Sequence, residues 1–393
     1  MTKSYIGRGV SPTKDDVKKA VADQSKGAFP GAFCKLVEDM AGDPEYCMAI
    51  HADGAGTKSS AAYIAYKETG DTKWFRQIAQ DSLVMNIDDL LCVGATSDFY
   101  LSNTIGRNAH RVDGACIAAV INGYDDVIGM LNDHGAGIVM TGGETADVGD
   151  LVRTMIVDST VMTRIPKKDV IHAAEIKPGH IIVGLSSSGQ ASYESAENSG
   201  ISSNGLTAAR HMLLSKIYQE KYPESVSETL MDHMVYCGKY RLEDALPGSS
   251  LTVGEALLSP TRTYLPVISR ILSLYRDKIS GIIHCTGGGL VKCRDFGTNL
   301  RYIKDNLFSL PPIFQAIYDL GEISAKEFYQ VFNCGHRMEL YCEPEYADSL
   351  IEIARSFSVD ARIVGRVEAL EGSSEQNAHN EVVIQSELGK FVY

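Results

Sequence analysis

The chain alternates short apolar stretches with longer stretches in which apolar residues recur every three or four positions. Short apolar runs rich in β-branched residues are typical of strands, and the longer periodic stretches are typical of helices. We predict strands over residues 48–52, 98–105, 137–141, 155–165, 180–186, 281–285, 329–333, 338–343 and 361–367. We predict helices over residues 58–69, 74–93, 112–134, 203–221, 264–275 and 345–357. This mixture predicts an α/β (α+β) fold.

A polar segment divides this pattern into two halves. Residues 166–179 contain two prolines and precede a new apolar run, HIIVGLSSSG. A chain of 393 residues has room for two or three domains, at ~150 residues each. We predict an N-terminal domain over residues 1–170, a C-terminal domain over 171–370 and a C-terminal tail over 371–393, in which VVIQSELGKFVY could add a strand. The small, polar segment 191–202 is predicted to be a mobile loop.

Composition and charge narrow the class of protein. Lys plus Arg is 37 and Asp plus Glu is 50, so the formal net charge is −13. This balance argues against nucleic-acid binding, which depends on cationic contacts to phosphates. The nine cysteines form no CxxC pair, which predicts a reduced, cytoplasmic chain without a disulfide framework or a zinc site. The start, MTKSYIGRGVSPTKDD, has no apolar signal segment, and no apolar run is long enough to predict a membrane span.

The segment HADGAGTK lies between a predicted strand and a predicted helix. Glycines let a ligand approach the backbone, and the helix start offers free N–H groups to an anion. The lysine could add a positive charge, and the aspartate could hold Mg²⁺. A tight turn with an exposed acid and lysine explains the same segment equally well. The candidate ligand-binding residues are Asp53, Gly54, Gly56, Thr57 and Lys58.

The predicted helix 74–93 carries Asp81, Asp88 and Asp89 among apolar residues. At ~100° per residue, Asp81 and Asp88 lie nearly in line along the helix. A buried carboxylate needs a partner, because burying a lone charge is very costly. A divalent cation is the simplest partner for several carboxylates. The alternative is that these acids lie at the solvent edge of an amphipathic helix.

Three further segments follow predicted strands. TGGETAD has a glycine pair that a ligand could approach, with an acid next to it, and the three glycines of HCTGGG could cradle a phosphate. In FNCG, the asparagine at the end of the predicted strand has a side-chain amide that could bind a ligand. The alternatives are an ordinary turn with an acid of no special role for TGGETAD, a flexible glycine turn for HCTGGG and a buried cap for FNCG. The residues concerned are Gly142, Gly143, Glu144, Thr145, His284, Thr286, Gly287 and Asn333. Motifs of zinc proteases, serine hydrolases and Rossmann dehydrogenases are absent from the sequence, which leaves phosphate-and-metal chemistry.

Taken in order, these segments resemble the aminoimidazole ribonucleotide synthetases, also called phosphoribosylformylglycinamidine cyclo-ligases. The resemblance covers residues 4–370. It includes SYIGRGV, DGAGTK, DSLVMNIDDL, VGATSDFYL, TGGETAD, SSSG followed by SSNGLTAAR, LLSPTRTYLPVI, HCTGGGL and FNCGHRM. LSPTR and FNCG make the resemblance closer to this family than to its relatives, which include formylglycinamidine ribonucleotide synthetase and thiamine monophosphate kinase.

The resemblance implies two α/β domains, with N-terminal strands that form a barrel shared across a homodimer. It implies ATP-dependent closure of formylglycinamidine ribonucleotide to aminoimidazole ribonucleotide in purine biosynthesis, with release of ADP and phosphate. Transfer of a phosphoryl group depends on positioning and charge neutralisation. Mg²⁺ held by Asp53, Asp89 and Glu144, with Asp88 nearby, could supply that neutralisation.

The resemblance also suggests roles for basic residues. Lys58 and the glycine turns would hold phosphates, and Lys26, from the N-terminal segment, could reach another. His284 would handle a proton or contact the substrate. The catalytic candidates are therefore Asp89, His284 and Lys58.

The chain departs from the family pattern in several places. The usual threonine before Asp53 is Ala52, which follows His51, and the usual asparagine before Asp89 is Asp88. The loop that usually reads GPHSNG has lost its histidine and gained an insertion, and the segment after GGETAD lacks Met-Pro-Gly. Two other functions stay open: another ATP-using enzyme of the superfamily that acts on a different amide, thiamine phosphate or carbamoyl group, or a non-catalytic nucleotide-binding subunit.

Overall fold

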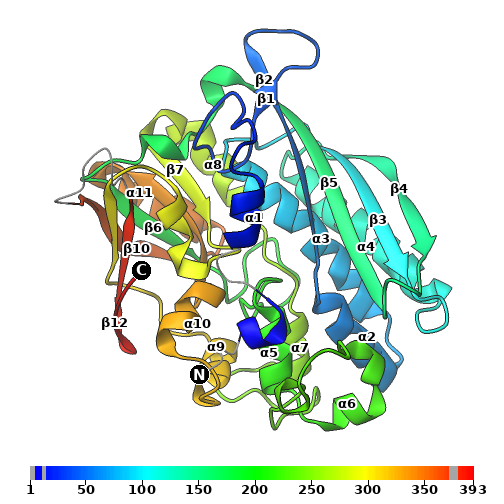
Figure 1. Ribbon diagram of the computed structural model, residues 1–393. Helices are drawn as coiled ribbons and strands as arrows, with labels where there is room; N and C mark the ends of the chain where they lie inside the picture. The colour runs from blue at the N-terminus through cyan, green and yellow to red at the C-terminus, as the bar shows by residue number, and fades with distance from the viewer. Residues whose placement is uncertain (1–4, 11–14, 371–378) are drawn as a thin grey trace.

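The computed structural model describes residues 5–10, 15–370 and 379–393, in which two sheets lie on either side of a long helix, α3 (Figure 1). The N-terminal sheet has the strand order β1-β2-β5-β3-β4. Its neighbours are antiparallel, except for the parallel pair β3–β4. The strands are β1 Val37–Glu38, β2 Tyr46–Gly54, β3 Tyr100–Arg107, β4 Val139–Asp147 and β5 Met155–Pro166.

Helices cover one face of the N-terminal sheet. The helix α3 (Lys73–Leu91) packs on β2 and β5, and α2 (Lys58–Thr69) and α4 (Gly114–Asp133) pack on α3. Along β5, residues that are fully buried alternate with more exposed ones over the whole strand, as expected for a sheet with one covered face. The edge strand β4 is exposed along almost its whole length. The five-stranded sheet therefore stays open, with no described helix on its second face.

The C-terminal sheet has the strand order β12-β11-β8-β10-β6-β9-β7. The pair β11–β8 is parallel and the other pairs are antiparallel. The helix α11 (Ala347–Ser356) packs on β6 and β10, with α8 (Leu265–Tyr275) beside it. The strands are β6 Ile181–Ser186, β7 Ile279–His284, β8 Leu300–Lys304, β9 His336–Cys342, β10 Ala361–Ala369, β11 Glu381–Ser386 and β12 Gly389–Val392.

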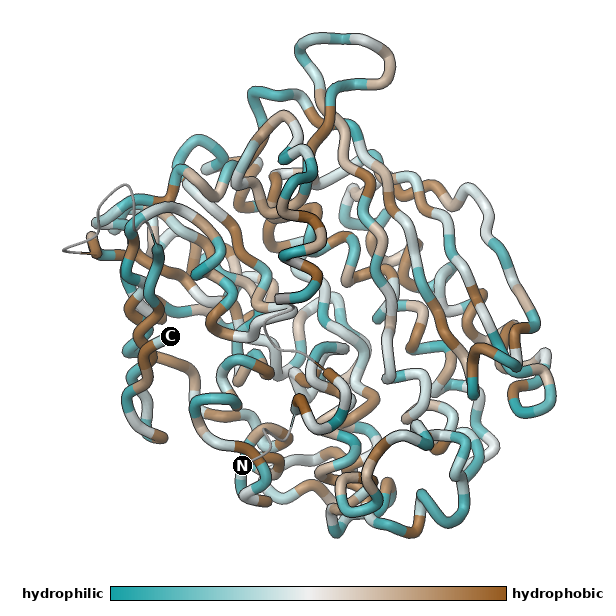
Figure 2. The backbone as a smooth tube through the Cα atoms, in the orientation of Figure 1, coloured by the Kyte–Doolittle hydropathy of each residue, from teal (hydrophilic) through white to brown (hydrophobic). Residues whose placement is uncertain are grey.

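Short helices of the second half extend beneath both domains, and α2 packs against two of them, α5 and α7 (Figure 1). Figure 2 shows hydrophobic positions along the strands and packed helices, and hydrophilic positions in many of the outer loops. The remaining helices are α1 Asp15–Ala20, α5 Leu206–Leu213, α6 Ile217–Lys221, α7 Val253–Leu258, α9 Pro312–Asp319 and α10 Ala325–Val331.

Several predicted elements are confirmed and three are wrong. The helix over 58–69 and the strand over 155–165 form as predicted. The predicted strand 329–333 is mostly the helix α10, which begins where the side chain of Ser324 accepts a hydrogen bond from the N–H of Glu327. The predicted helix 203–221 is interrupted, because residues 214 and 215 bridge to residues 240 and 238. The predicted strand 137–141 runs on as β4 through the glycine pair.

The last strands belong to the second sheet. The strand predicted in VVIQSELGKFVY is confirmed as β11, which pairs with β8, and β12 follows it. The predicted tail over 371–393 therefore folds in part with the C-terminal sheet. Residues 371–378 lie outside the described residues.

The segment 191–202, predicted to be a mobile loop, is anchored in the structure. Nη2 of Arg262 donates to Oε2 of Glu194 at 2.5 Å, and Nη1 donates to the carbonyl of Ser188 at 2.8 Å. The hydroxyl of Tyr193 donates to the carbonyl of Thr263 at 2.7 Å. The physical reason is the buried guanidinium of Arg262, which needs the acceptors that this segment provides.

In the described part of the chain, α4 is the one helix that is long and apolar enough to cross a membrane. One of its faces packs closely on α3. A Cβ on Gly123 would come within 2.0 Å of the carbonyl oxygen of Arg76, so glycine is needed for this approach. The hydroxyl of Tyr124 lies 2.8 Å from Oγ of Ser159 on β5. The helix α4 therefore packs against the rest of the domain along one face.

A buried ion pair of the N-terminal domain fastens a segment of the C-terminal domain. Nζ of Lys58 donates to Oδ1 of Asp81 at 2.7 Å, and it also donates to the carbonyl of Ser259. The N–H of Thr261 donates to the same carboxylate oxygen at 2.8 Å. Burial lowers the pKa of Lys58, and the charge of Asp81 opposes this shift. Both charged side chains are fully buried.

The first prediction concerns this pair. Lys58→Met leaves the carboxylate of Asp81 buried without its counter-ion, and removing one partner of a buried pair costs about 3–5 kcal/mol. We expect the free energy of unfolding to fall by that amount in urea titrations. The control is Lys67→Met, since Lys67 is an exposed lysine on the same helix. If the two variants unfold at the same urea concentration, the pair does not hold the domains together.

The C-terminal sheet contains a second buried charged group. Nζ of Lys304 donates to Oε1 of Glu339 at 2.5 Å, Nε2 of His336 lies 2.9 Å from that oxygen, and the hydroxyl of Tyr341 donates to Oε2 at 2.6 Å. Burial raises the pKa of Glu339, but Lys304 and His336 outweigh it and bring the pKa to about 2. Burial lowers the pKa of His336 below 6.5, although Glu339 opposes this shift.

The second prediction is the pH dependence of stability that follows. Both groups bind protons more weakly in the folded than in the unfolded chain, so acid favours unfolding. The contribution of His336 to the free energy of unfolding is complete above pH 6.5 and declines as the pH falls. The contribution of Glu339 is complete above pH 4.5 and is lost as the pH approaches about 2. We expect that, in the double variant Lys304→Met/Glu339→Gln, the free energy of unfolding falls less steeply as the pH is lowered. Glu352→Gln, at an exposed glutamate on α11, should leave it unchanged.

Candidate functional site

Motifs from the two halves of the sequence meet where α3 crosses between the domains. The first half supplies the carboxylates of α3 and the end of β2. The second half supplies the segment around Thr263 and the ends of β7 and β9, which carry His284 and Arg337. The junction therefore brings together segments that are up to 249 positions apart in the chain.

Asp88 joins the domains and has no room for a metal ion. Nη2 of Arg337 donates to its Oδ2 at 3.0 Å, while the hydroxyl of Thr263 and the N–H of Tyr264 donate to Oδ1 at 3.0 and 3.2 Å. Its side chain is fully buried. This geometry does not support the prediction that Asp88 binds Mg²⁺, because donors of the C-terminal domain already satisfy both of its oxygens.

His284 lies between Arg337 and Asp89. A guanidinium only donates, so Nη1 of Arg337, at 2.8 Å, makes Nε2 of His284 an acceptor. The ring proton then sits on Nδ1, which donates to Oδ1 of Asp89 at 2.5 Å. Both nitrogens are engaged and the ring is fully buried. The predicted role of His284 in moving a proton or contacting substrate does not fit this arrangement, and the ring instead orients Asp89.

His51 is a partly exposed cationic group at this junction. Nδ2 of Asn86 donates to the carbonyls of Asp53 and Ser82, so its Oδ1 is left to accept from Nδ1 of His51 at 3.0 Å. Nε2 of His51 lies 3.2 Å from Oδ2 of Asp89. Since both partners accept, both ring nitrogens carry protons and the ring is an imidazolium.

The surroundings of His51 and Asp89 favour their charged forms. Burial lowers the pKa of His51, but the hydrogen bond to Asp89 and its charge outweigh it and raise the pKa above 6.5. Burial raises the pKa of Asp89, but His284 and His51 hold it well below its usual range. The side chain of His51 is 23% exposed, so its charge reaches the surface. The sequence showed His51 as a departure from the family pattern and not as a site residue.

Two carboxylates lie at the end of β2. Asp53 is exposed, and Asp158 on β5 stands opposite Gly54 in register. A Cβ on Gly54 would lie 1.8 Å from Oδ1 of Asp158, so only glycine leaves room for this carboxylate. Burial raises the pKa of Asp158, and the charge of Asp53 raises it further. Sequence reasoning missed Asp158, because one acid in an alternating strand carries no signal of its own.

Of the other residues of the DGAGTK turn, Gly56 and Thr57 are exposed and Lys58 is buried. Gly56 has a φ of +57° and is exposed. Oγ1 of the exposed Thr57 lies 2.7 Å from Oγ1 of Thr207 on α5, which connects the turn to the second domain. Lys58 points inward to Asp81, so the geometry does not support the prediction that its ammonium holds a phosphate. The exposed part of the turn is left to contact a ligand.

Glu144 does not join Asp53 and Asp89 within one chain. Asp53 pairs in register with Ser159, which faces the helices. Glu144 pairs with Thr104, which is exposed on the opposite face. Side chains alternate between faces along a strand, and three strand spacings separate β2 from β4, roughly 14 Å. The predicted cluster of three carboxylates is therefore not formed by a single chain.

The other residues of this motif lie in the edge strand and not in a turn. Gly142 has a φ of +113°, and a Cβ on Gly143 would lie 1.8 Å from Oδ1 of Asn103. Thr145 is exposed. The glycine pair thus accommodates the neighbouring strand β3, a packing role that glycines in strands commonly have.

Asn333 acts as a buried cap, which was the alternative to ligand binding. Its Oδ1 accepts from the hydroxyl of Ser187 at 2.8 Å and from the N–H of Gly335 at 3.0 Å. Its Nδ2 donates to the carbonyl of Gly200 at 2.8 Å. Since both ends of the amide are used, the prediction that Asn333 binds a cofactor is not supported by its geometry.

The HCTGGG segment lies beside the SSNG segment. Nδ2 of Asn204 donates to Oγ1 of Thr286, and the exposed Gly287 has a φ of +60°. Lys26 is exposed on the N-terminal segment. Gly287 and Lys26 are therefore accessible to a ligand, whereas Thr286 is buried, and ligand binding by these residues stays a prediction.

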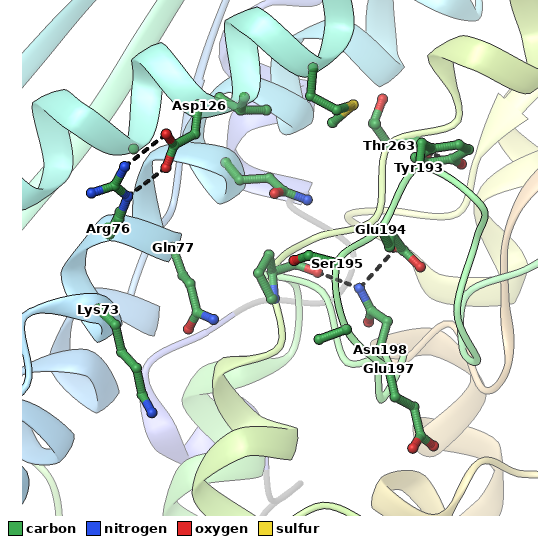
Figure 3. Close-up of a pocket in the computed structure, with 16 residues that line it drawn as sticks. Lys73, Arg76, Gln77, Asp126, Tyr193, Glu194, Ser195, Glu197, Asn198 and Thr263 are labelled. Atoms are coloured by element: carbon green, nitrogen blue, oxygen red, sulfur yellow. Dashed lines mark hydrogen bonds and ion pairs between the residues drawn. The ribbon is translucent and has the colours of Figure 1, made fainter.

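A cavity of about 380 Å³ lies between α3, α4 and the segment 193–198 (Figure 3). Its charged walls are already paired: Arg76 with Asp126 at 2.5 Å, and Glu194 with Arg262. None of the residues predicted from the motifs lines it. The cavity is therefore separate from the group around His51 and Asp89.

Solved structures of low sequence identity share the fold. The T. maritima PurL complexed with FGAR has a TM-score of 0.57 at 14% identity, covering 99% of this chain and 51% of that one. A hydrogenase maturation protein HypE in complex with ATP has a TM-score of 0.52 at 14% identity, covering 88% of this chain and 84% of that one. This chain spans about half the length of the PurL chain.

Sequence comparisons identify the family. Residues 34–165 match the AIR synthase related protein, N-terminal domain, and residues 177–376 match the C-terminal domain. A phosphoribosylformylglycinamidine cyclo-ligase of Methanococcus maripaludis (strain C6) is 30% identical over 93% of this chain and 92% of its own. One of Alkaliphilus metalliredigens is 26% identical over 94% and 93%. The chain belongs to the AIR synthase related family, within its phosphoribosylformylglycinamidine cyclo-ligases.

Proposed function

We propose that this protein uses ATP to close formylglycinamidine ribonucleotide to aminoimidazole ribonucleotide in purine biosynthesis. The observation that carries the proposal is the meeting of the family's motifs from both halves of the chain at the junction around Asp89 and Arg337. The curated relatives that match nearly the whole chain bear the name of this activity.

The reaction makes definite physical demands. The γ-phosphoryl group of ATP passes to the formamide oxygen, a nitrogen of the amidine side attacks the same carbon, and phosphate leaves as the ring closes. Phosphorylation is needed because an amide oxygen is a poor leaving group. Since phosphoryl transfer depends on positioning and on neutralising charge, the enzyme needs donors and positive charge near the phosphates.

Residues of the junction can meet these demands. The exposed backbone of Gly56 and Thr57 at the start of α2 would bind phosphate oxygens. The imidazolium of His51 would supply the positive charge that the buried Lys58 does not. Asp89 would keep His51 protonated and oriented, and His284 would orient Asp89 in turn.

Mg²⁺ would neutralise phosphate charge when it is bound with ATP. The exposed carboxylate of Asp53, at the end of β2, is an oxygen donor that fits it, since Mg²⁺ uses one or two carboxylates together with the phosphates. Neither Asp88 nor Glu144 enters this proposal.

We also propose a homodimer in which a second copy covers the open face of the N-terminal sheet, and in which the strands of both copies close into a barrel. Strand alternation puts Ile50, Tyr100 and Ile156 on this face, and each is at least 38% exposed. Open strand edges and exposed apolar side chains favour association. Glu144 is on the same face, so dimerisation would bury it at the interface.

The direct test is purified protein with ATP, Mg²⁺ and formylglycinamidine ribonucleotide, with products identified by mass. We expect ADP, phosphate and aminoimidazole ribonucleotide, and ADP release only when this ribonucleotide is present. Tight ATP binding without turnover on any amide would favour a non-catalytic subunit. Turnover on another amide, thiamine phosphate or a carbamoyl group would favour a different enzyme of the superfamily.

Adjacent acids on α3 provide a matched pair of variants. An amide at position 89 cannot accept hydrogen bonds from both His284 and His51, and it removes the charge that holds the proton on His51. For Asp89→Asn we expect a folded protein whose ATP turnover falls at least tenfold, about 1.4 kcal/mol. Asp88→Asn should instead cost about 3–5 kcal/mol of stability, because it leaves Arg337 buried without its counter-ion.

These two effects are separated by urea unfolding and by turnover per folded molecule. If Asp89→Asn and Asp88→Asn lose the same stability, and turnover per folded molecule does not change, Asp89 has no part in the reaction.

The dimer is tested by light scattering of dilute protein. We expect a mass of about twice 42.7 kDa. The double variant Ile50→Glu/Ile156→Glu puts charge on the open face and should give monomers. Ile121→Glu, on the exposed side of α4, should leave the mass unchanged. A native protein that is monomeric and active would contradict the shared barrel.

A further inference from the structure

We propose that Cys34, His51 and Asp89 form a binding site for a divalent transition metal, zinc above all, at the edge of the domain junction. Sγ of Cys34, one ring nitrogen of His51 and one carboxylate oxygen of Asp89 all lie within 4.8 Å of one another. The three residues come from the N-terminal segment, β2 and α3. No spacing of donors in the sequence indicates such a site, because only the fold brings them together.

The distances suit tetrahedral zinc. With Zn–N and Zn–O near 2.0 Å and Zn–S near 2.3 Å, tetrahedral ligands lie roughly 3.3 Å apart for N and O and roughly 3.5 Å apart for S and either of them. Nε2 of His51 is already 3.2 Å from Oδ2 of Asp89. Since the sulfur lies within 4.8 Å of the other two donor atoms, it would need to approach them by at most about 1.3 Å. On binding, the Nε2 proton and the thiol proton leave to water, so the positive charge at this position would come from the ion in place of the imidazolium of the metal-free protein.

Hydrogen bonds behind the ligands hold them in place. Nδ1 of His51 donates to Oδ1 of Asn86 at 3.0 Å, so Nε2 is the nitrogen presented to an ion. Nδ1 of His284 donates to the other oxygen of Asp89 at 2.5 Å, which leaves Oδ2 for the metal. Metal-binding histidines and carboxylates usually have such supporting partners. The arrangement therefore orients the ligands before an ion arrives.

The chemistry of the donors favours zinc over magnesium. A thiolate and an imidazole select softer ions, whereas Mg²⁺ prefers oxygen. His51 is partly exposed, so an ion can enter from solvent, and water could supply a fourth ligand. A second group, Cys285, His336 and Glu339, is equally close but fully buried. We assign no metal to this group, because its carboxylate is already paired with the ammonium of Lys304.

The test uses the full-length protein, stripped of metal and titrated with Co²⁺ and then Zn²⁺ in the absence of ATP. Co²⁺ reports its ligands, because a bound thiolate gives a charge-transfer band in the near ultraviolet. We expect one Co²⁺ per chain with this band, displacement by Zn²⁺, and no displacement by excess Mg²⁺. No nucleotide is present, so the result does not depend on the proposed function.

Variants assign the ligands. Cys34→Ser should remove the charge-transfer band and weaken Zn²⁺ binding at least tenfold, and His51→Gln should weaken it similarly. His51→Gln keeps the test decisive if Cys34→Ser fails to fold. Two control variants are Cys237→Ser, at an exposed cysteine, and Cys285→Ala, in the second group. Both should leave the charge-transfer band and the affinity for Zn²⁺ unchanged. Absence of Co²⁺ binding, or a band unaffected by Cys34→Ser, would overturn the proposal.

Discussion

Burial of three carboxylates on one helix is the constraint on which the structure depends. Asp81, Asp88 and Asp89 all lie on α3, between the two sheets, where an unpaired charge is very costly. Each is satisfied by different donors: Lys58 and Thr261 for Asp81, Arg337 for Asp88, and two histidines for Asp89. Because most of these donors belong to the C-terminal domain, satisfying α3 fixes how the domains sit against each other.

The same constraint produces the candidate site. Asp88 and Asp89 are adjacent, but the helix turns one towards Arg337 and Tyr264 and the other towards His51 and the surface. The first contributes to the join between domains. The second holds an imidazolium in place at the surface. A single turn of helix thus connects the packing of the domains to the chemistry of the junction.

The N-terminal sheet differs from α3, because one of its faces has no packing partner among the described residues of a single chain. One face meets α3, and the other presents apolar side chains and Glu144 to solvent in a single chain. A residue that faces away from Asp89 cannot share a cation with it, whatever its place in a motif. The function of such a residue depends on what covers that face.

The class of fold, the helix 58–69, the strand 155–165 and the family could all be predicted from the sequence, because periodicity and motifs are local properties. It also indicated that the acids of α3 need partners. Which partners they have could not be predicted from local patterns, since Asp88 meets Arg337 across 249 positions and Asp89 meets His284 across 195. For the same reason Lys58 turned inward, Glu144 fell on the far face of the sheet and His51 became the exposed cation. The direction of a side chain depends on the charges that other segments bring to it.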